Sequence, residues 1–307
     1  MNLSLILSTK GRVAELSAYL DSLLLAFKET PAGTTVELII SDQNEDDRLK
    51  DCLSRFTQAF PEHPGLSLQH VKTRNGLSQG RNVGLIFASG DLVAFPDDDC
   101  LYDSNVLREA LRVFAENPLV GFLGVGSKDA LKDATTIPMP TEPCGINVRL
   151  MPLFSPTLFV RRSWLAKVGG FDESLGVGAP FYGAGEETDL VLRLLSAGAL
   201  GIYLPQPIVF HPAKALNPLS RAQLRRQLSY GRGLGGILAK HKKAYGYFFW
   251  VQLLLNTVMR PLASYRSANQ FLQSVAYSAG VVSGLMHHRK VPLAGPPPMR
   301  SACAINR

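Results

Sequence analysis

A short apolar run that ends in three successive carboxylates constrains this chain more than any other feature. Residues 92–95 are apolar, and Asp97, Asp98 and Asp99 follow them after a single proline. An apolar, β-prone run of this length predicts a buried strand. In an open α/β sheet, ligands bind in the crevice beyond the strand ends. We therefore expect the three carboxylates at a binding site.

Adjacent carboxylates repel one another and need either full solvation or a bound cation. Carboxylate oxygens are the ligands that Mg²⁺ and Mn²⁺ prefer. The sequence thus predicts a site for one of these ions with a diphosphate, and His211, at the end of a predicted strand over 202–210, could complete its ligand set. A solvated acidic loop after a strand is the alternative.

Strands and helices alternate along the first two thirds of the chain. Apolar periodicity predicts strands at 3–8, 36–40, 66–71, 120–125 and 152–160, and helices at about 16–27, 48–60, 77–88, 106–116 and 161–168. This alternation indicates an α/β fold with a mostly parallel central sheet flanked by helices. With 307 residues, 46% of them hydrophobic, the chain can form one large domain with an appendage.

Polar residues follow the predicted strands at points where a nucleotide could bind. Asp42 lies just past the second strand and could accept a hydrogen bond from a base or a ribose. Asn75 and Gly76 precede a helix whose first backbone N–H groups are unpaired, and Arg81 lies in its first turns. This arrangement suits a phosphate, although a capped helix with a solvated arginine explains it equally well.

A glycine-rich loop over 176–185 leads directly into Glu186 and Glu187. A mobile loop beside paired carboxylates is typical of a general base that is covered during reaction. Acidic residues are also favoured in the first turn of any helix by the helix dipole, which is the structural alternative.

Charge is distributed very unevenly along the chain. All 25 acidic residues lie at or before Asp189 with 17 Lys and Arg, which gives the first 189 residues a net charge of −8. The remaining 118 residues carry 15 basic side chains and no acidic one. A cationic and partly apolar segment suits the anionic cytoplasmic face of a membrane. Its apolar blocks do not resemble a base-stacking surface, so nucleic acid is not expected as a partner.

The C-terminal part divides into a helical extension over 216–290 and a Pro-rich tail over 291–307 that we expect to be disordered. The pattern at 220–243 predicts a basic amphipathic helix broken by glycines, and two uncharged blocks follow at 244–259 and 267–288. In the second block Ala276, Gly280 and Gly284 recur at four-residue spacing, which permits close helix packing. Three arrangements stay open: helices lying on a membrane, a hairpin dipping into it, or a soluble helical subdomain.

Four scattered cysteines without CxxC spacing indicate reduced thiols, and the N-terminus shows no cleavable signal sequence, so a cytoplasmic location is expected.

Several separated motifs, in order over residues 1–215, resemble the family 2 glycosyltransferases with the GT-A fold. The matching segments are Ser8-Thr9-Lys10-Gly11-Arg12, Asp42, Asn75-Gly76-Leu77, Gly80-Arg81-Asn82, Asp97-Asp98-Asp99, Phe171-Asp172-Glu173 and Glu186-Glu187-Thr188-Asp189. In place of the family's usual aspartate base the chain has Glu187, so the choice between Glu186 and Glu187 stays open.

The resemblance implies a role for each matching position. Asp99 and Asp97, with His211, would hold the metal, and Asp97 would also contact the ribose or sugar. Phe171, Asp172 and Glu173 would lie near the donor sugar and the acceptor. The residues assigned to the nucleotide donor are Ser8, Thr9, Arg12, Asp42, Asn75, Arg81, Asp97 and Asp98.

The expected activity is inverting transfer of a sugar from a nucleotide sugar to an acceptor hydroxyl, on a saccharide or lipid-linked acceptor in cell-surface polysaccharide or glycolipid assembly. A divalent cation and a basic side chain would neutralise the leaving diphosphate. A sugar nucleotidyltransferase and a non-catalytic, membrane-anchored sugar-binding protein are the alternatives.

Overall fold

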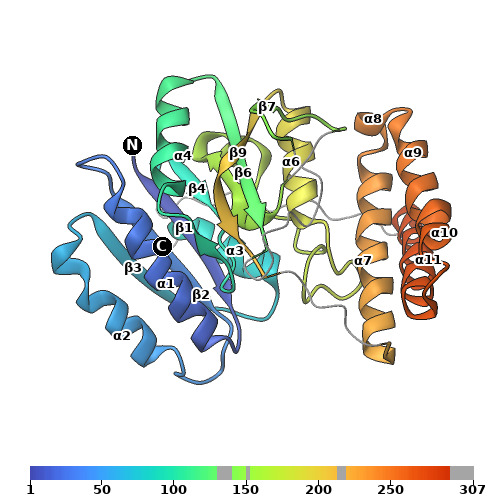
Figure 1. Cartoon of the computed structure of the whole chain (residues 1–307), viewed down its shortest axis with the longest axis horizontal. Helices are drawn as coiled ribbons and strands as arrows, with labels where there is room; N and C mark the ends of the chain where they lie inside the picture. Colours follow the sequence, from blue (N-terminus) through green and yellow to red (C-terminus); the bar gives the residue numbers. More distant parts are fainter. Residues whose placement is uncertain (130–139, 150–152, 213–218, 291–307) are drawn as a thin grey trace.

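A mixed β-sheet forms the centre of the molecule (Figure 1). The computed structural model describes residues 1–129, 140–149, 153–212 and 219–290. The strand order is β3-β2-β1-β4-β8-β6-β9-β5, with β7 paired to β9. The strands are β1 (Leu3–Thr9), β2 (Val36–Asp42), β3 (Leu66–Lys72), β4 (Leu92–Ala94), β5 (Leu101–Tyr102), β6 (Val120–Lys128), β7 (Cys144–Gly145), β8 (Leu158–Arg161) and β9 (Leu200–Phe210).

Helices follow most of the strands in the first part of the chain, and further helices form the extension. They are α1 (Val13–Lys28), α2 (Lys50–Gln58), α3 (Leu77–Phe87), α4 (Val106–Glu116), α5 (Arg162–Val168), α6 (Glu186–Ser196), α7 (Arg221–Lys240), α8 (Lys242–Tyr245), α9 (Phe248–Leu254), α10 (Arg260–Ala263) and α11 (Ala268–Lys290). Short helical turns lie at η1 (Phe60–Glu62), η2 (Ser155–Thr157) and η3 (Leu255–Met259).

The expectation of a mostly parallel sheet is wrong for one half of it. Strands β3, β2, β1 and β4 are parallel, but β8 runs antiparallel between β4 and β6. The chain leaves β6 at the carboxyl edge, and the described part of the connection to β8 contains no α-helix that would return it to the other edge. Strand β8 therefore starts from the edge where β6 ended.

The predicted strand over 152–160 is also shorter than expected. Within the described residues the strand begins at Leu158, and the 3₁₀ turn η2 precedes it. Pro156 lacks an N–H group for a sheet ladder, which explains why the apolar pattern there does not continue as a strand.

Each face of the sheet has its own apolar core, because successive side chains of a strand point to opposite faces. Leu5 and Leu7 of β1 pack with α1, α2 and α4 on one face. Ile6 packs on the other face with α3, α5 and α6. The sheet is therefore fully covered, and the carboxyl ends of its parallel strands remain for a site.

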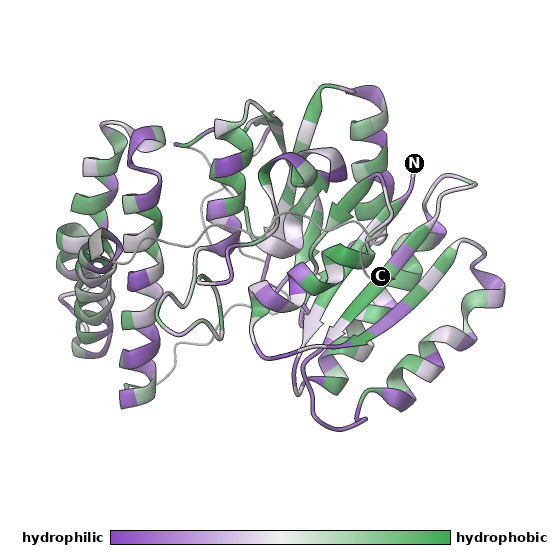
Figure 2. Cartoon of the chain, turned by 180° about the vertical axis from the view of Figure 1, so that it is seen from behind, coloured by the Kyte–Doolittle hydropathy of each residue, from purple (hydrophilic) through white to green (hydrophobic). Residues whose placement is uncertain are grey.

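The helical extension packs beside the sheet through a third apolar core. Leu175, Tyr182 of the glycine-rich loop and Leu192 of α6 belong to this core with Ile237 of α7 and Val281 of α11. Figure 2 shows apolar colouring along the sheet and again on the outer helices of the extension. The extension thus lies directly beside the loop that precedes α6 (Figure 1).

The expected break in the basic helix is wrong, since α7 is continuous over 20 residues. Glycines of α7 and α11 allow the two helices to approach each other closely, as the four-residue spacing in α11 predicted. A Cβ atom at Gly280 would lie 2.2 Å from the Leu228 carbonyl oxygen, and one at Gly284 would lie 2.2 Å from that of Arg232. Within the described residues, no helix combines the length and apolar character that crossing a membrane requires.

The proline-rich tail over 291–307 lies outside the described residues. Cys52, Cys100 and Cys144 are free thiols, as the cysteine pattern predicted for them.

Candidate active site

A cavity of about 810 Å³ opens at the carboxyl ends of β1, β2 and β4. Its walls come from those strand ends, from the segment before α3, from the glycine-rich loop and from α7. The lining residues are Ser8, Thr9, Lys10, Arg12, Gln43, Asn75, Gly76, Leu77, Asp97, Asp98, Asp99, Val177, Gly178, Ala179, Gly183, His211, Arg226, Ser229 and Tyr230. The cavity thus contains most of the predicted donor-binding residues.

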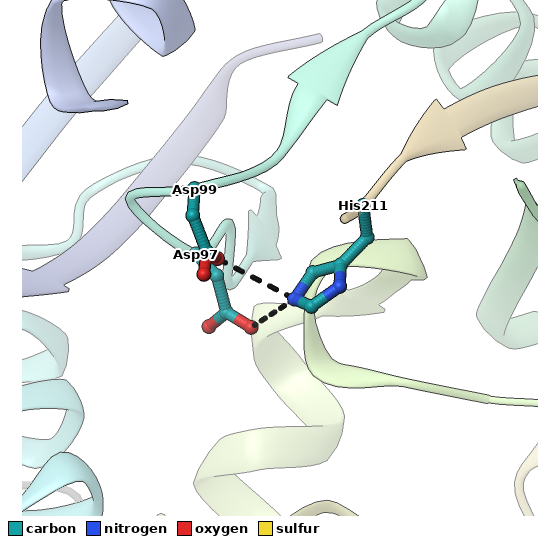
Figure 3. A group of neighbouring side chains, drawn as sticks. All are labelled: Asp97, Asp99 and His211. Atoms are coloured by element: carbon teal, nitrogen blue, oxygen red, sulfur yellow. Dashed lines mark ion pairs between the residues drawn. The ribbon is translucent and has the colours of Figure 1, made fainter. Parts of the chain in front are cut away.

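Asp97, Asp99 and His211 converge in this cavity (Figure 3). One oxygen of each carboxylate and one imidazole nitrogen lie within 4.8 Å of one another. His211 Nε2 lies 3.4 Å from Asp99 Oδ1 and 3.8 Å from Asp97 Oδ2. The predicted metal ligands therefore form one group, although His211 follows the two aspartates by 112 or more positions in the sequence.

The imidazole of His211 is oriented by the backbone. Its Nδ1 lies 3.1 Å from the carbonyl oxygen of Pro212, which can only accept a hydrogen bond, so Nδ1 carries the proton. The neutral ring then presents the Nε2 lone pair to the carboxylates, an orientation typical of a metal-ligating histidine. When Nε2 is also protonated, its hydrogen bond to Asp99 stabilises the charged ring, which raises the pKa of His211 above its usual value.

Asp98 links the aspartate triplet to Thr9 and Arg12. It is buried, and Thr9 Oγ1 donates a hydrogen bond of 2.7 Å to its Oδ2. Arg12 Nη1 lies 2.8 Å from Asp98 Oδ1 and 2.5 Å from Asp99 Oδ2. Burial raises the pKa of Asp98, whereas at Asp99 the contacts with His211 and Arg12 outweigh burial and lower the pKa.

Arg81 joins the aspartate triplet to the predicted catalytic glutamates. Its side chain is 1% exposed, and its guanidinium lies 2.9 Å from Asp97 and 3.4 Å from Glu186. It also lies over the ring of Phe171 at 5.2 Å from the centroid. Arg81 is therefore behind the cavity wall, and it holds the two acidic groups on the same side of the sheet.

Glu186 and Glu187 begin α6 immediately after Gly185, whose φ of +98° lies in the left-handed region that favours glycine. Glu187 is partly buried, and burial together with the neighbouring Glu186 raises the pKa of its carboxyl to about 8. Neither glutamate is among the described residues that line the cavity. Arg81 connects the two glutamates to the cavity, because it pairs with both Asp97 and Glu186.

Asp42 lies below the cavity floor rather than on it. It is fully buried, with Oδ1 accepting from the Asn44 backbone N–H at 2.8 Å and Oδ2 lying 2.9 Å from His70 and 3.0 Å from Lys72. These contacts outweigh burial and lower its pKa. The neighbouring Gln43 lines the cavity in its place.

Two further donor-binding predictions fall on the cavity wall. The hydroxyl of Ser8 is buried without a hydrogen-bond partner among the described residues. Asn75 Oδ1 accepts a hydrogen bond of 2.6 Å from Lys10 Nζ. The unpaired Ser8 hydroxyl is a group that a ligand could satisfy.

The segment with Phe171, Asp172 and Glu173 lies mostly away from the cavity. Phe171 is fully buried and packs edge-to-face on Phe95 at 4.8 Å. Asp172 is also fully buried and accepts a hydrogen bond of 2.8 Å from Lys240. Glu173 is exposed and accepts from Asn82 at 3.0 Å.

The extension contributes residues that sequence reasoning missed. Arg226, Ser229 and Tyr230 of α7 line the cavity. Lys240 Nζ and His241 Nε2 lie 2.7 and 2.8 Å from the same oxygen of Asp189 in α6. The basic pattern of this segment indicated a membrane surface, and nothing in its spacing points to a pairing with an acid 50 or so positions earlier.

The fold and the cavity together are those of a glycosyltransferase. Residues 4–161 match the model of the family described as Glycosyl transferase family 2, which is just over half of the chain. The chain belongs to this family, and the resemblance seen in the sequence is confirmed.

Relatives of known sequence are also glycosyltransferases. An uncharacterised glycosyltransferase of Haemophilus influenzae is 24% identical over 241 residues, which cover 75% of this chain and 76% of that protein. The pre-mycofactocin glycosyltransferase of Mycobacterium tuberculosis is 28% identical over 202 residues, covering 58% of this chain and 38% of that protein.

Solved structures share the fold. A mannosyltransferase from Pyrobaculum calidifontis in complex with GDP-Man and Mn²⁺ has a TM-score of 0.60 at 18% identity, over 99% of this chain and 78% of that one. Staphylococcus aureus TarS 1-349 in complex with UDP-GlcNAc has a TM-score of 0.56 at 15% identity, over 94% and 92%.

Proposed function

We propose that the chain is an inverting, divalent-metal-dependent glycosyltransferase that moves a sugar from a nucleoside diphosphate sugar to an acceptor hydroxyl. The observation that supports this most is the convergence of Asp97, Asp99 and His211 in one cavity, with Arg81 behind its wall pairing both with Asp97 and with Glu186. The structural neighbours with GDP-Man and Mn²⁺ or with UDP-GlcNAc agree with such a donor.

The three converging side chains fit Mg²⁺ or Mn²⁺. They offer two carboxylate oxygens and one imidazole nitrogen, a donor set that suits Mn²⁺ in particular. A cation held there would neutralise the charge that develops on the leaving diphosphate. Arg12 has a side chain that is 48% exposed and can turn from Asp99 toward the diphosphate when a cation takes its place.

The nucleotide would occupy the side of the cavity formed by β1 and β2. The Ser8 hydroxyl, Gln43 and Asn75 face this side, while Asp42 fixes the turn that carries Gln43 through its hydrogen bonds to Asn44. In this proposal Asp42 orders the nucleotide-binding loop. It would contact the base only if one of its present hydrogen-bond or ion-pair partners moved away.

Glu187 is the proposed general base. It would take the proton of the acceptor hydroxyl as that oxygen attacks the anomeric carbon, in a single displacement that inverts the configuration. A raised pKa near 8 puts this carboxylate close to the pH at which it would work. The carboxylate of the neighbouring Glu186 is already paired with Arg81 at 3.4 Å, which leaves Glu187 as the proposed base.

The outer helices suit a bilayer surface, and we place the enzyme at the cytoplasmic face of a membrane, acting on saccharide or lipid-linked acceptors in cell-surface polysaccharide or glycolipid assembly. Large apolar side chains that are 46–65% exposed gather on α9, η3 and α10: Trp250, Leu254, Leu255, Val258, Met259, Leu262 and Tyr265. No acidic residue follows Asp189, so anionic lipids meet no repulsion there.

The first test is donor turnover. Purified protein with UDP, GDP and dTDP sugars and Mn²⁺ should release the nucleoside diphosphate, and EDTA should stop the release. Asp99→Asn should abolish it, whereas Asp51→Asn, on the exposed face of α2, should not. Release of pyrophosphate from a nucleoside triphosphate would indicate a nucleotidyltransferase, and donor binding without turnover would indicate a non-catalytic protein.

The membrane proposal has its own test, sedimentation with phosphatidylglycerol and phosphatidylcholine vesicles. Leu254→Ser with Leu262→Ser should reduce binding to the anionic vesicles. Leu119→Ser is the matched control, since Leu119 is 79% exposed on the loop before β6. Equal binding of all three proteins would contradict the proposal.

A further inference from the structure

One wall of the cavity comes entirely from the extension. Arg226, Ser229 and Tyr230 of α7 line the same cavity as the aspartate triplet. The backbone N–H of Gly183 donates to the carbonyl oxygen of Ser229 at 3.1 Å, and a Cβ atom at Gly183 would lie 2.2 Å from Ser229 Oγ. This wall therefore adjoins the loop that leads into Glu186 and Glu187.

Arg226 is the charged group of this wall. Its guanidinium donates to the Tyr230 hydroxyl at 3.0 Å and lies 5.2 Å from the centroid of the tyrosine ring. Among the described residues no carboxylate pairs with it. The side chain is partly buried and held in place by an aromatic partner, so it is preorganised to bind an anion.

The acids of the cavity are already engaged, and the extension contains none. Asp97 pairs with Arg81, Asp98 with Arg12, and Asp99 with Arg12 and His211. The cavity thus has an acidic side that suits a metal-bound diphosphate and a cationic wall, from α7, that suits a separate anion. The cationic wall adjoins the loop that leads into the proposed base, through Gly183 and Ser229.

We propose that α7 forms the acceptor subsite and that Arg226, with Tyr230, binds a phosphate group carried by the acceptor. This rests on the proposed function, since it assigns the acceptor of that same reaction. The phosphate could belong to a soluble phosphorylated polyol or sugar, or to a phospholipid-type carrier, because Arg226 recognises the same chemistry in both.

The test is calorimetric titration of the full chain after saturation with Mn²⁺ and the nucleoside diphosphate that it binds. Saturation keeps the probes out of the donor site. The probes are sn-glycerol 3-phosphate, glycerol and short-chain dihexanoyl phosphatidic acid. The phosphorylated probes should bind at least about tenfold tighter than glycerol, as expected for a charge-assisted pair. The tighter of the two phosphorylated probes identifies a soluble or a lipid source.

Variants decide whether Arg226 is responsible. Arg226→Gln should remove the preference for phosphate, and Arg226→Lys should keep part of it. Arg225→Gln is the matched control, because Arg225 is the next residue, is exposed and does not line the cavity. Circular dichroism of each variant checks that the helix is formed.

Two results would overturn the inference: a preference for phosphate that survives in Arg226→Gln, or equal binding of glycerol and glycerol 3-phosphate by the unmodified protein. Loss of nucleoside diphosphate binding in Arg226→Gln would likewise assign the arginine to the donor. Failure of the inference leaves Mn²⁺-dependent donor turnover intact, whereas failure of the proposed function removes that turnover itself.

Discussion

Replacing Lys240 by methionine should destabilise the protein, because this lysine joins the extension to two buried carboxylates. Its Nζ lies 2.8 Å from Asp172 Oδ2 and 2.7 Å from Asp189 Oδ1, and both aspartates are fully buried. Methionine keeps most of the side-chain volume and removes only the charge. The perturbation therefore isolates the ion pairs.

The size of the effect follows from which partners remain. Removing one member of a buried ion pair costs about 3–5 kcal/mol. Asp189 retains Arg193 at 2.8 Å and His241 at 2.8 Å, so removing Lys240 costs little free energy at Asp189. Asp172 keeps hydrogen bonds from Ser174 and bears most of the penalty. We expect the free energy of unfolding to fall by about 3 kcal/mol, at the lower end of that range.

The effect should depend on pH with a definite sign. Hydrogen bonds from Lys240 and Ser174 outweigh burial and hold the pKa of Asp172 below its usual value. A lowered pKa stabilises the folded protein above the unfolded pKa, and this contribution is lost as the pH falls. The difference between Lys240→Met and the unmodified protein should thus be largest near neutrality and narrow below about pH 4.

Urea unfolding at several pH values measures this, with Lys243→Met as the control because Lys243 is exposed nearby. The double variant Lys240→Met with Asp172→Asn should recover much of the loss, since it removes the buried charge that lost its partner. Unchanged stability in Lys240→Met, or a double variant no more stable than the single one, would refute the reasoning.

Three other outcomes are expected. Glu187→Gln should abolish transfer while nucleoside diphosphate binding stays. The kcat/KM of the unmodified enzyme should rise with pH through about 8, because only ionised Glu187 accepts a proton. Full activity of Glu187→Gln, or a flat pH profile, would assign the role to Glu186. His211→Ala should weaken Mn²⁺ binding at least about tenfold in a calorimetric titration, and unchanged affinity would exclude it as a ligand. Gly280→Val should lower the free energy of unfolding by about 1–3 kcal/mol by forcing α11 from α7, whereas the exposed Ala279→Val should not.

Much of the site could be predicted because strand periodicity is local. Short apolar runs defined β1, β2 and β4, and the side chains at or just after the end of each strand, such as Thr9 and Asp97, necessarily lie at its carboxyl end. Parallel strands share that edge, so these residues meet once the strands pair. The unequal distribution of charge between the two parts of the chain was also fully visible in the sequence.

What only the tertiary structure decided are contacts between elements distant in the chain. Burial gives Asp42 structural partners rather than an open position in the cavity, and no spacing rule separates it from Asp97. Lys240 pairs with Asp172 and Asp189 because α7 packs beside α6, a contact set by shape complementarity and close helix approach. Such contacts depend on how whole elements fit together, so the sequence determined the strands and their terminal residues, and packing decided which side chains face the cavity.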